Sequence, residues 1–225
     1  MSYAFDWSSI PGAIPALIDG AKVTFEVLLI ALAVAIPFGA LLAVMRLSSN
    51  KALSWFAAAY TNVFRSIPLV MVILWFYLIV PQLLRSVFGG DIENIGLVSA
   101  MTAFALFESA YYAEIFRAGI QSVPKGQMGA ATALGMTNSQ AMILIILPQA
   151  FRNMTPLLLT QAIVLFQDTS LVYIIGVMDF LKTAYAVGER DGRIVEMLIF
   201  AGAMYFIVSF ALSQAVKQLQ KRMGK

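Results

Sequence analysis

RAGIQSVPKGQMGAATALGMTNSQAMILIILPQAFRN, residues 117–153, is a mixed segment of small, polar and apolar residues between two long apolar runs. Residues 127–134 within it are rich in Ala, Met and Leu, which favours a short helix. Gly135 suits the position just past the end of that helix, where the backbone turns left-handed. Residues 142–147 are apolar but too few to cross a membrane. The segment therefore predicts short helices outside the bilayer, joined at a glycine.

A second short helix should follow that glycine. Asn138 or Ser139 can act as its N-cap and accept hydrogen bonds from its first free N–H groups. Pro148 should end it, because proline lacks an N–H group and its ring clashes with the preceding turn. Two short helices that meet at a glycine form a compact knob, which can dock into a groove on a soluble partner. Residues 126–148 are called the knob below.

The composition of the chain is that of a membrane protein. Of its 225 residues, 60% are hydrophobic and 12% are charged, and the mean hydropathy is +0.84. Soluble domains carry about 25% charged residues, so a soluble chain of this kind could not cover its own surface. The length suits a single domain. We expect the lipid bilayer as a partner and no nucleic acid, and no cleavable signal peptide is evident.

Residue types that the chain lacks exclude several kinds of chemistry. It contains no Cys and no His, which excludes thiolate and imidazole metal ligands, Ser-His-Asp and Cys-His catalysis, and disulfide bonds. The phosphate-binding pattern GxxxxGK[ST] is also absent, so the chain itself should not hydrolyse ATP. We therefore expect no catalytic residue, no metal and no cofactor.

Five stretches are long and apolar enough to span a bilayer as helices, which takes roughly 20 residues. Residues 55–64 are apolar but short, and they predict an interfacial helix. Ser66 is a plausible N-cap for the second span, with Pro68 in its first turn, and Pro37 should kink the first. The five predicted spans are Val23–Val44, Ile67–Leu84, Ile95–Phe116, Thr155–Val177 and Val195–Val216.

The distribution of charge predicts the orientation of these spans. Ten of the 15 Lys and Arg residues fall on one side of the membrane, and nine of the twelve acidic residues fall on the other. Lys and Arg concentrate in cytoplasmic loops. The sequence thus predicts an all-α membrane protein with five transmembrane helices, a periplasmic N-terminus and a cytoplasmic C-terminus. Residues 1–18 should be a periplasmic segment, residues 19–216 the membrane domain and residues 217–225 a basic cytoplasmic tail.

Glu108 lies near the middle of the third span, where a charged side chain is costly and indicates function. On a helix it shares a face with Tyr111 and Tyr112. One interpretation is that this face lines a substrate path, with Glu108 protonated or in contact with an ammonium group. The other is a hydrogen bond between helices that fixes their packing, and Gln161 on the fourth span is open to the same two interpretations.

Asp168, Thr169 and Ser170 follow one another late in the fourth span. Their side chains can compete for backbone hydrogen bonds and disturb the helix there. A disturbed helix exposes polar backbone where it lines a cavity, so these three residues are candidates for the substrate path. The alternative is an ordinary helix end.

Other charged residues allow two interpretations each. Glu114 and Arg117, at i and i+3, should pair on the third span. Arg65 and Arg152 either follow the positive-inside rule or hold an anionic substrate before its release. The cluster GERDG, residues 188–192, either contacts a binding protein through its charges or is a solvated turn.

Several motifs resemble those of ABC importer permeases. Gly129-Ala130-Ala131, three residues, Gly135, nine residues and then Ile145-x-Leu147-Pro148 have the spacing of that family's EAA motif. EIFRAGI and VPKGQ, before and at the start of the knob, are similar to the version found in polar amino-acid importers, as are FRSIPL and DTSL. The chain resembles the glutamate/aspartate branch most, through LPQAF, LLLTQ, LFQDTSLVY and GERDG.

This resemblance implies the type I permease fold, a place in the bacterial inner membrane and a division of labour. A periplasmic amino-acid-binding protein delivers substrate, a second homologous permease completes the path as a heterodimer, and a dimer of cytoplasmic ABC ATPases drives transport. Gly129 stands where the family has an acidic residue, so coupling should rest on shape and apolar packing more than on a salt bridge. The expected coupling residues are Gly126, Gln127, Gly129, Ala130, Ala131, Ala133, Gly135 and Pro148.

The residues leave other functions open. Glutamine or a basic amino acid could replace glutamate and aspartate as the substrate. A stand-alone secondary transporter is disfavoured, because such proteins usually pair two repeats and this chain shows none. An intramembrane enzyme ranks last, since no paired carboxylates occur on facing spans.

Overall fold

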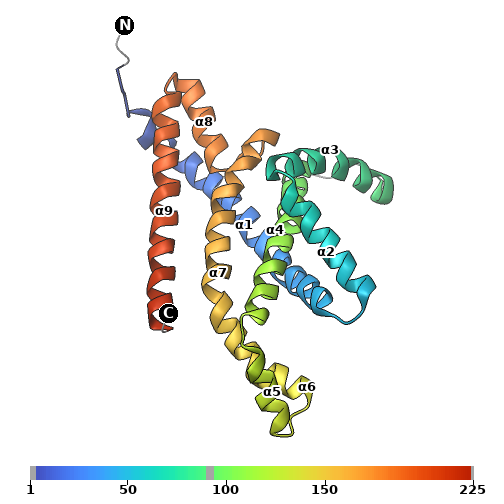
Figure 1. Cartoon of the computed structure of the whole chain (residues 1–225). Helices are drawn as coiled ribbons and strands as arrows, with labels where there is room; N and C mark the ends of the chain where they lie inside the picture. The colour runs from blue at the N-terminus through green and yellow to red at the C-terminus, as the bar shows by residue number, and fades with distance from the viewer. Residues whose placement is uncertain (1–3, 90–93, 224–225) are drawn as a thin grey trace. The chain divides into compact units, whose positions relative to one another are not determined.

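The computed structural model describes residues 4–89 and 94–223, and every element in these ranges is helical. Five of its helical segments are long and apolar enough to cross a membrane, so the expected all-α fold with five spans is confirmed. The elements, labelled in Figure 1, are α1 (Ser9–Leu47), α2 (Lys51–Ser66), α3 (Leu69–Phe88), α4 (Ile95–Gln121), α5 (Lys125–Ala133), α6 (Asn138–Ala141), η1 (Met142–Ile146), α7 (Leu147–Asp168), η2 (Thr169–Ile175), α8 (Phe180–Asp191) and α9 (Ile194–Arg222).

The first two spans begin elsewhere than predicted. α1 starts at Ser9 rather than Val23 and runs through Pro37 without a break. Its 39 residues are roughly 58 Å long, nearly twice what a bilayer requires. Ser66 does not cap the second span, because it is the last residue of α2. Pro68 occupies the N-cap of α3 instead, without a side-chain hydrogen bond.

The second helix of the knob does not stop at Pro148, so that prediction is wrong. α6, the π-helix η1 and α7 form one continuous segment, and Pro148 is the second residue of α7. The N–H group of Leu147 bonds to the carbonyl of Met142, five residues earlier. A π-turn widens the helix at this point and gives the proline ring room where an ordinary turn would clash.

The chain divides into two compact units, which are described separately. The first unit comprises Met1–Ala33, Pro68–Ala105 and Ile163–Ser213, and the second comprises Val34–Ile67, Leu106–Ala162 and Gln214–Lys225. The boundaries pass through α1, α4, α7 and α9, so each unit is built from helices that continue into the other.

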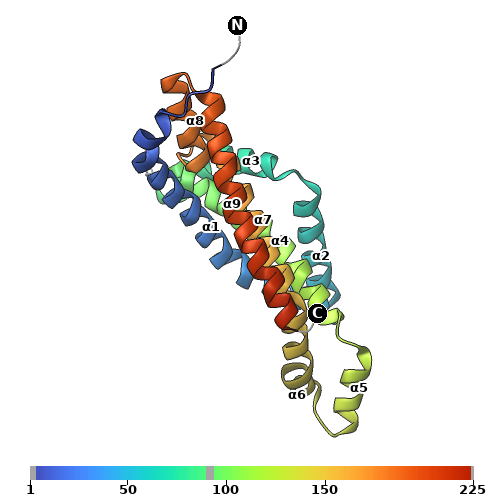
Figure 2. The ribbon, with the colours of Figure 1, turned by 90° about the vertical axis from the view of Figure 1, so that its left-hand side faces the viewer.

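In the first unit, α8 packs against α1 and the beginning of α9, and the three helices lie together in both views (Figures 1 and 2). Gly20 permits this packing, because a Cβ atom there would lie 2.6 Å from Thr183 Oγ1 and 2.8 Å from the carbonyl oxygen of Asp179. The shared apolar core consists of Ala13, Leu17, Ala184, Val187, Met197 and Ala201.

In the second unit, small residues let α1 and α7 approach α4. A Cβ atom on Gly39 would lie 2.7 Å from the Cβ of Tyr112, and one on Gly119 would lie 2.8 Å from Met154. Leu42, Ala57 and Ala113 form a buried cluster of α1, α2 and α4.

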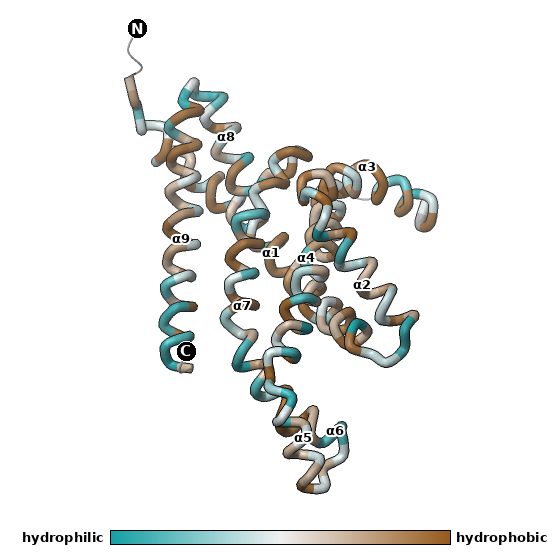
Figure 3. The backbone as a smooth tube through the Cα atoms, in the orientation of Figure 1, coloured by the Kyte–Doolittle hydropathy of each residue, from teal (hydrophilic) through white to brown (hydrophobic). Residues whose placement is uncertain are grey.

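The hydropathy colouring in Figure 3 is brown over much of the spans and teal at the C-terminal end of α9.

Candidate functional site

The knob has the form that the sequence predicts, with one correction. α5 ends before Gly135, whose φ of +84° is left-handed as expected. The N–H groups of Gly135 and Met136 return to the carbonyls of Thr132 and Ala131, which completes the helix end. The cap of the second helix is Thr137, not Asn138 or Ser139. Its hydroxyl accepts from the N–H of Gln140, and the Gln140 side chain accepts from the N–H of Thr137.

A small apolar cluster ties the knob to the two spans that enclose it. Val123, Ile146 and Ala150 are buried there, and partly buried residues of α4, α5 and η1 pack around them. The views agree that α5 and α6 lie next to each other (Figures 1 and 2). Through this cluster, α5 is packed against the end of α4 and the start of α7.

The predicted coupling residues differ in exposure. Ala131 is 3% exposed, so it belongs to the core of the knob and not to its surface. Gly129 faces open space, because a Cβ atom there would meet nothing within 4 Å. Leu134, just past the end of α5, is 84% exposed. The other predicted residues, Gly126, Gln127, Ala130, Ala133, Gly135 and Pro148, are exposed.

Glu114 is the centre of an ionic cluster in the second unit, which is called the Glu114 cluster below. Arg117, its expected partner, donates to Glu114 Oε2 from Nη2 at 2.6 Å and from Nε at 3.0 Å. Arg46 and Arg65 also lie at salt-bridge distance, 3.4 and 3.8 Å from the carboxylate. Three guanidinium groups from α1, α2 and α4 thus surround one carboxylate. Sequence spacing revealed only Arg117, because Arg46 and Arg65 are far from Glu114 along the chain.

Arg65 and Arg152 both have protein partners. The guanidinium of Arg65 lies over the Tyr111 ring, 5.6 Å from its centroid, besides its contact with Glu114. Arg152 donates from Nε and Nη2 to the carbonyl oxygen of Met223, at 3.1 and 2.5 Å. Each arginine therefore has a structural role in fastening parts of the second unit together.

Glu108 is fully buried and accepts a hydrogen bond from Gln161 Nε2 at 2.9 Å, which joins α4 to α7. Tyr112, also fully buried, donates to the carbonyl oxygen of Leu158 on α7 at 3.4 Å. Tyr111 lies instead beside Arg65. The structure therefore brings Glu108 and Gln161 together and joins Tyr112 to the same helix, α7.

Asp168, Thr169 and Ser170 lie in the first unit, at a change of helix type. α7 ends at Asp168, and the 3-10 helix η2 begins at Thr169. The hydroxyls of Thr169 and Ser170 donate to the carbonyls of Phe166 and Gln167, at 2.6 and 2.8 Å. The disturbance expected at these three residues is present, and Gly176, with φ +79°, ends η2.

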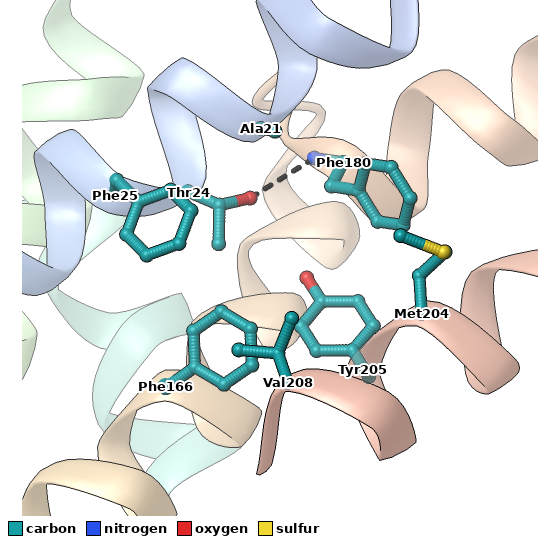
Figure 4. Close-up of a pocket in the computed structure, with 8 residues that line it drawn as sticks. All are labelled: Ala21, Thr24, Phe25, Phe166, Phe180, Met204, Tyr205 and Val208. Atoms are coloured by element: carbon teal, nitrogen blue, oxygen red, sulfur yellow. Dashed lines mark hydrogen bonds between the residues drawn. The ribbon is translucent and has the colours of Figure 1, made fainter. Parts of the chain in front are cut away.

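A cavity of about 150 Å³ lies in the first unit, and nothing in the sequence indicated it (Figure 4). The polar side chains that line it form hydrogen bonds within the protein. Thr24 Oγ1 accepts from the N–H of Phe180 at 3.1 Å, and the Tyr205 hydroxyl donates to Asp179 Oδ2 at 3.4 Å. The lining residues are Ala21, Thr24, Phe25, Phe166, Phe180, Met204, Tyr205 and Val208.

The cluster GERDG forms the end of α8 and the turn to α9. Gly192, with φ +68°, caps α8, and Arg190 pairs with Asp191 at 2.7 Å. That hydrogen bond lowers the pKa of Asp191. Nearby, Arg193 pairs with Asp6 at 3.1 Å. Hydrogen bonds from Ser8, with Arg193 close by, hold the pKa of Asp6 below its ordinary value.

A family of transport proteins matches most of the chain. Residues 35–225 match the family described as binding-protein-dependent transport system inner membrane component. The chain belongs to this family. It is therefore an inner-membrane transport component of the ABC importer permease type, a type whose members work with an ATPase and a binding protein.

Curated relatives extend the match along the whole chain. The glutamate/aspartate import permease protein GltK of Escherichia coli O157:H7 is 59% identical over 221 residues, covering 98% of this permease chain and 99% of the relative. The arginine transport system permease protein ArtQ of Bacillus subtilis is 32% identical, covering 97% of both chains.

Solved structures confirm the type I permease fold. A crystal structure of an amino acid ABC transporter with histidines has a TM-score of 0.88 at 32% identity, covering 98% of this chain and all of that one. The inward-facing MetNI methionine ABC transporter has a TM-score of 0.71 at 19% identity, which is a likeness of fold.

Proposed function

We propose that this chain is the permease subunit of an ATP-driven importer that carries glutamate and aspartate across the bacterial inner membrane. The observation that carries the proposal is 59% identity, over nearly all of both chains, to a glutamate/aspartate import permease. Identity to arginine and glutamine permeases is lower, at 32% and 35%. The chain itself is non-catalytic, and ATP hydrolysis belongs to its partner.

Competition uptake tests this proposal. The chain would be expressed with its binding protein, second permease and ATPase in a host that lacks acidic amino-acid uptake. Unlabelled aspartate should suppress uptake of labelled glutamate, while glutamine and arginine at the same concentration should not. Equal suppression by glutamine or by arginine would replace the substrate with an amide or a basic amino acid. Uptake that followed an ion gradient without ATP would reject the importer mechanism.

We propose further that the knob receives the movement of the ATPase. Its exposed small and apolar residues Gly129, Ala130 and Leu134 support docking by shape and apolar contact. The cluster of Val123, Ile146 and Ala150 supports transmission to α4 and α7.

Cysteine crosslinking tests the docking surface, and the chain offers a matched control. Ala130→Cys and Ala133→Cys should crosslink to the ATPase, because both positions are exposed. Ala131→Cys should not, because its side chain is buried between them. Crosslinks from Ala130→Cys and Ala133→Cys to the binding protein alone would reverse the proposed topology.

We also propose the remaining parts of the assignment: the topology rests on the distribution of charge, the second permease on the family resemblance, and the substrate path on polar residues within the spans. The N-terminus and residues 1–18 lie on the periplasmic side, residues 19–216 form the membrane domain, and the basic tail 217–225 lies in the cytoplasm. A second, homologous permease pairs with this chain as a heterodimer. Polar groups proposed for the substrate path are, in the second unit, Glu108, Tyr111, Tyr112 and Gln161 and, in the first unit, Asp168, Thr169 and Ser170.

A further inference from the structure

α8 reaches deep along the spans of the first unit. Its first residues, at Asp179 and Phe180, contact Thr24 of α1 and Tyr205 of α9. Tyr205 lies eleven residues beyond the start of α9, which is roughly 16 Å along the helix axis. The hydrocarbon layer is about 30 Å thick. In the proposed topology α9 enters the hydrocarbon layer from the periplasm near Ile194, which places the start of α8 near the middle of the membrane. From there α8 runs back toward the periplasmic end of α9.

Lys182 lies on the deep part of this helix. It precedes Asp191, the last residue of α8, by nine positions, or roughly 14 Å. Its ammonium group lies over two aromatic rings, 4.9 Å from the centroid of Tyr173 and 5.4 Å from that of Tyr185. The two rings meet edge to face at 5.3 Å. Lys182, Tyr173 and Tyr185 are called the Lys182 cage below.

The charge of Lys182 has no carboxylate partner within salt-bridge distance among residues 4–89 and 94–223. Asp179, one turn earlier, turns its carboxylate to the N–H groups of Leu181 and Lys182, as the cap of α8, and to the Tyr205 hydroxyl. Other cations of the first unit have such partners: Lys22 pairs with Asp19, Arg190 with Asp191 and Arg193 with Asp6. The Lys182 cage thus holds a cation in place without neutralising it.

A charged group at membrane depth is expensive and marks a path for substrate or ions. Aromatic rings attract a cation through their quadrupole, but they leave its formal charge available. An anion that entered the cage would complete the coordination of the ammonium group. The cage is therefore suited to a carboxylate that crosses the membrane and leaves again.

We propose that Lys182 receives a carboxylate of the acidic amino acid during transport, and that the Lys182 cage makes the permease selective for anionic substrates. This inference rests on the proposed function, because it requires a substrate with an additional carboxylate. The tyrosines are positioning residues that hold the ammonium group toward the incoming anion.

The test uses the complete complex in proteoliposomes, with labelled glutamate and saturating substrate-loaded binding protein. Lys182→Met removes the charge and keeps the stem, and it should lower the maximal uptake rate roughly tenfold or more. Lys182→Arg keeps a cation over the rings and should stay within about threefold of the unmodified protein. Lys22→Met is the matched control, because it removes an exposed lysine whose charge is already paired with Asp19. It should leave uptake unchanged.

Three further measurements separate the possible failures. Basal ATPase activity reports whether each variant assembles. If Lys182→Met does not assemble, two variants of Tyr185 replace it in the test. Tyr185→Leu removes the aromatic ring and should slow uptake, whereas Tyr185→Phe keeps the ring and should not. Titration of the binding protein distinguishes substrate contact from docking, because a docking defect disappears at saturation.

The inference is overturned if Lys182→Met transports glutamate at the normal rate once the binding protein is saturating, or if Lys182→Arg is as slow as Lys182→Met. Where the Tyr185 variants are used instead, equal uptake rates for Tyr185→Leu and Tyr185→Phe overturn the inference. The proposed function fails in a different way, when the unmodified complex takes up neither glutamate nor aspartate.

Discussion

The Glu114 cluster and the Lys182 cage hold positive charge in opposite ways. In the cluster, three guanidinium groups surround one carboxylate whose side chain is 16% exposed. In the cage, one ammonium group lies between two tyrosine rings. Ion pairs fix parts of a fold because the removal of one partner leaves the other charges uncompensated. A cation–π contact fixes the position of a charge but leaves it able to bind an anion. The Glu114 cluster therefore holds helices together, whereas the Lys182 cage keeps a charge available for the transported anion.

The largest effect on stability should come from Glu114→Gln. This change leaves Arg46, Arg65 and Arg117 with mutual repulsion and a weaker acceptor, and it should cost about 2–3 kcal/mol of folding free energy. Thermal unfolding of the purified chain in detergent measures it. Glu114→Asp is the control and should lose less, since the charge remains. An unchanged melting temperature for Glu114→Gln would remove the structural role of the cluster.

The next effect should come from Gly20→Ala, which disturbs the support of the Lys182 cage. The added methyl group would overlap Thr183 and the backbone of Asp179, and overpacking of this kind costs about 1–3 kcal/mol. Gly12→Ala, on the same helix, meets nothing within 4 Å and should be neutral or slightly stabilising. The same unfolding assay compares the two variants. Equal melting temperatures would mean that α8 can shift away from α1 at little cost.

A smaller difference should separate two arginines of the Glu114 cluster. Arg46 bridges Glu114 and the Thr61 hydroxyl, the latter at 2.7 Å, whereas the side chain of Arg65 is 43% exposed and 3.8 Å from Glu114. Both contacts come from Nη1 at the end of the planar guanidinium, and the ammonium group of lysine does not reproduce that geometry. Arg46→Lys should therefore cost about 1 kcal/mol, and Arg65→Lys less than about 0.5 kcal/mol. The reverse order in denaturant unfolding would place the main support of Glu114 on α2.

The smallest effect on stability should be that of Lys182→Met. A partly exposed cation–π contact contributes about 0.5–1 kcal/mol, and methionine recovers some of it by packing on the rings. The melting temperature should therefore stay close to that of the unmodified chain while transport falls. A loss of stability as large as that of Glu114→Gln would make the Lys182 cage structural and would erase the contrast between the two regions.

The number of spans and the form of the knob could be predicted from the sequence because they depend on neighbours along the chain. An apolar run of about 20 residues specifies a span by its length, and Gly135 specifies a left-handed helix end. The pairing of Glu114 with Arg117 followed in the same way from helical spacing. The prediction at Pro148 failed, because proline usually ends a helix by clashing with the preceding turn. Here that turn is a π-turn, which residue types along the chain did not indicate.

The sequence by itself determined a five-span permease with a knob between its third and fourth spans, since hydropathy, turn residues and motif spacing are local properties. Only the tertiary structure placed Arg46 and Arg65 on Glu114, joined Glu108 to Gln161, and folded α8 back along α1 and α9 so that Lys182 meets two tyrosines. These contacts join residues of different helices. Their partners are fixed by how small residues such as Gly20 and Gly39 let the helices approach, and no periodicity within one helix records that.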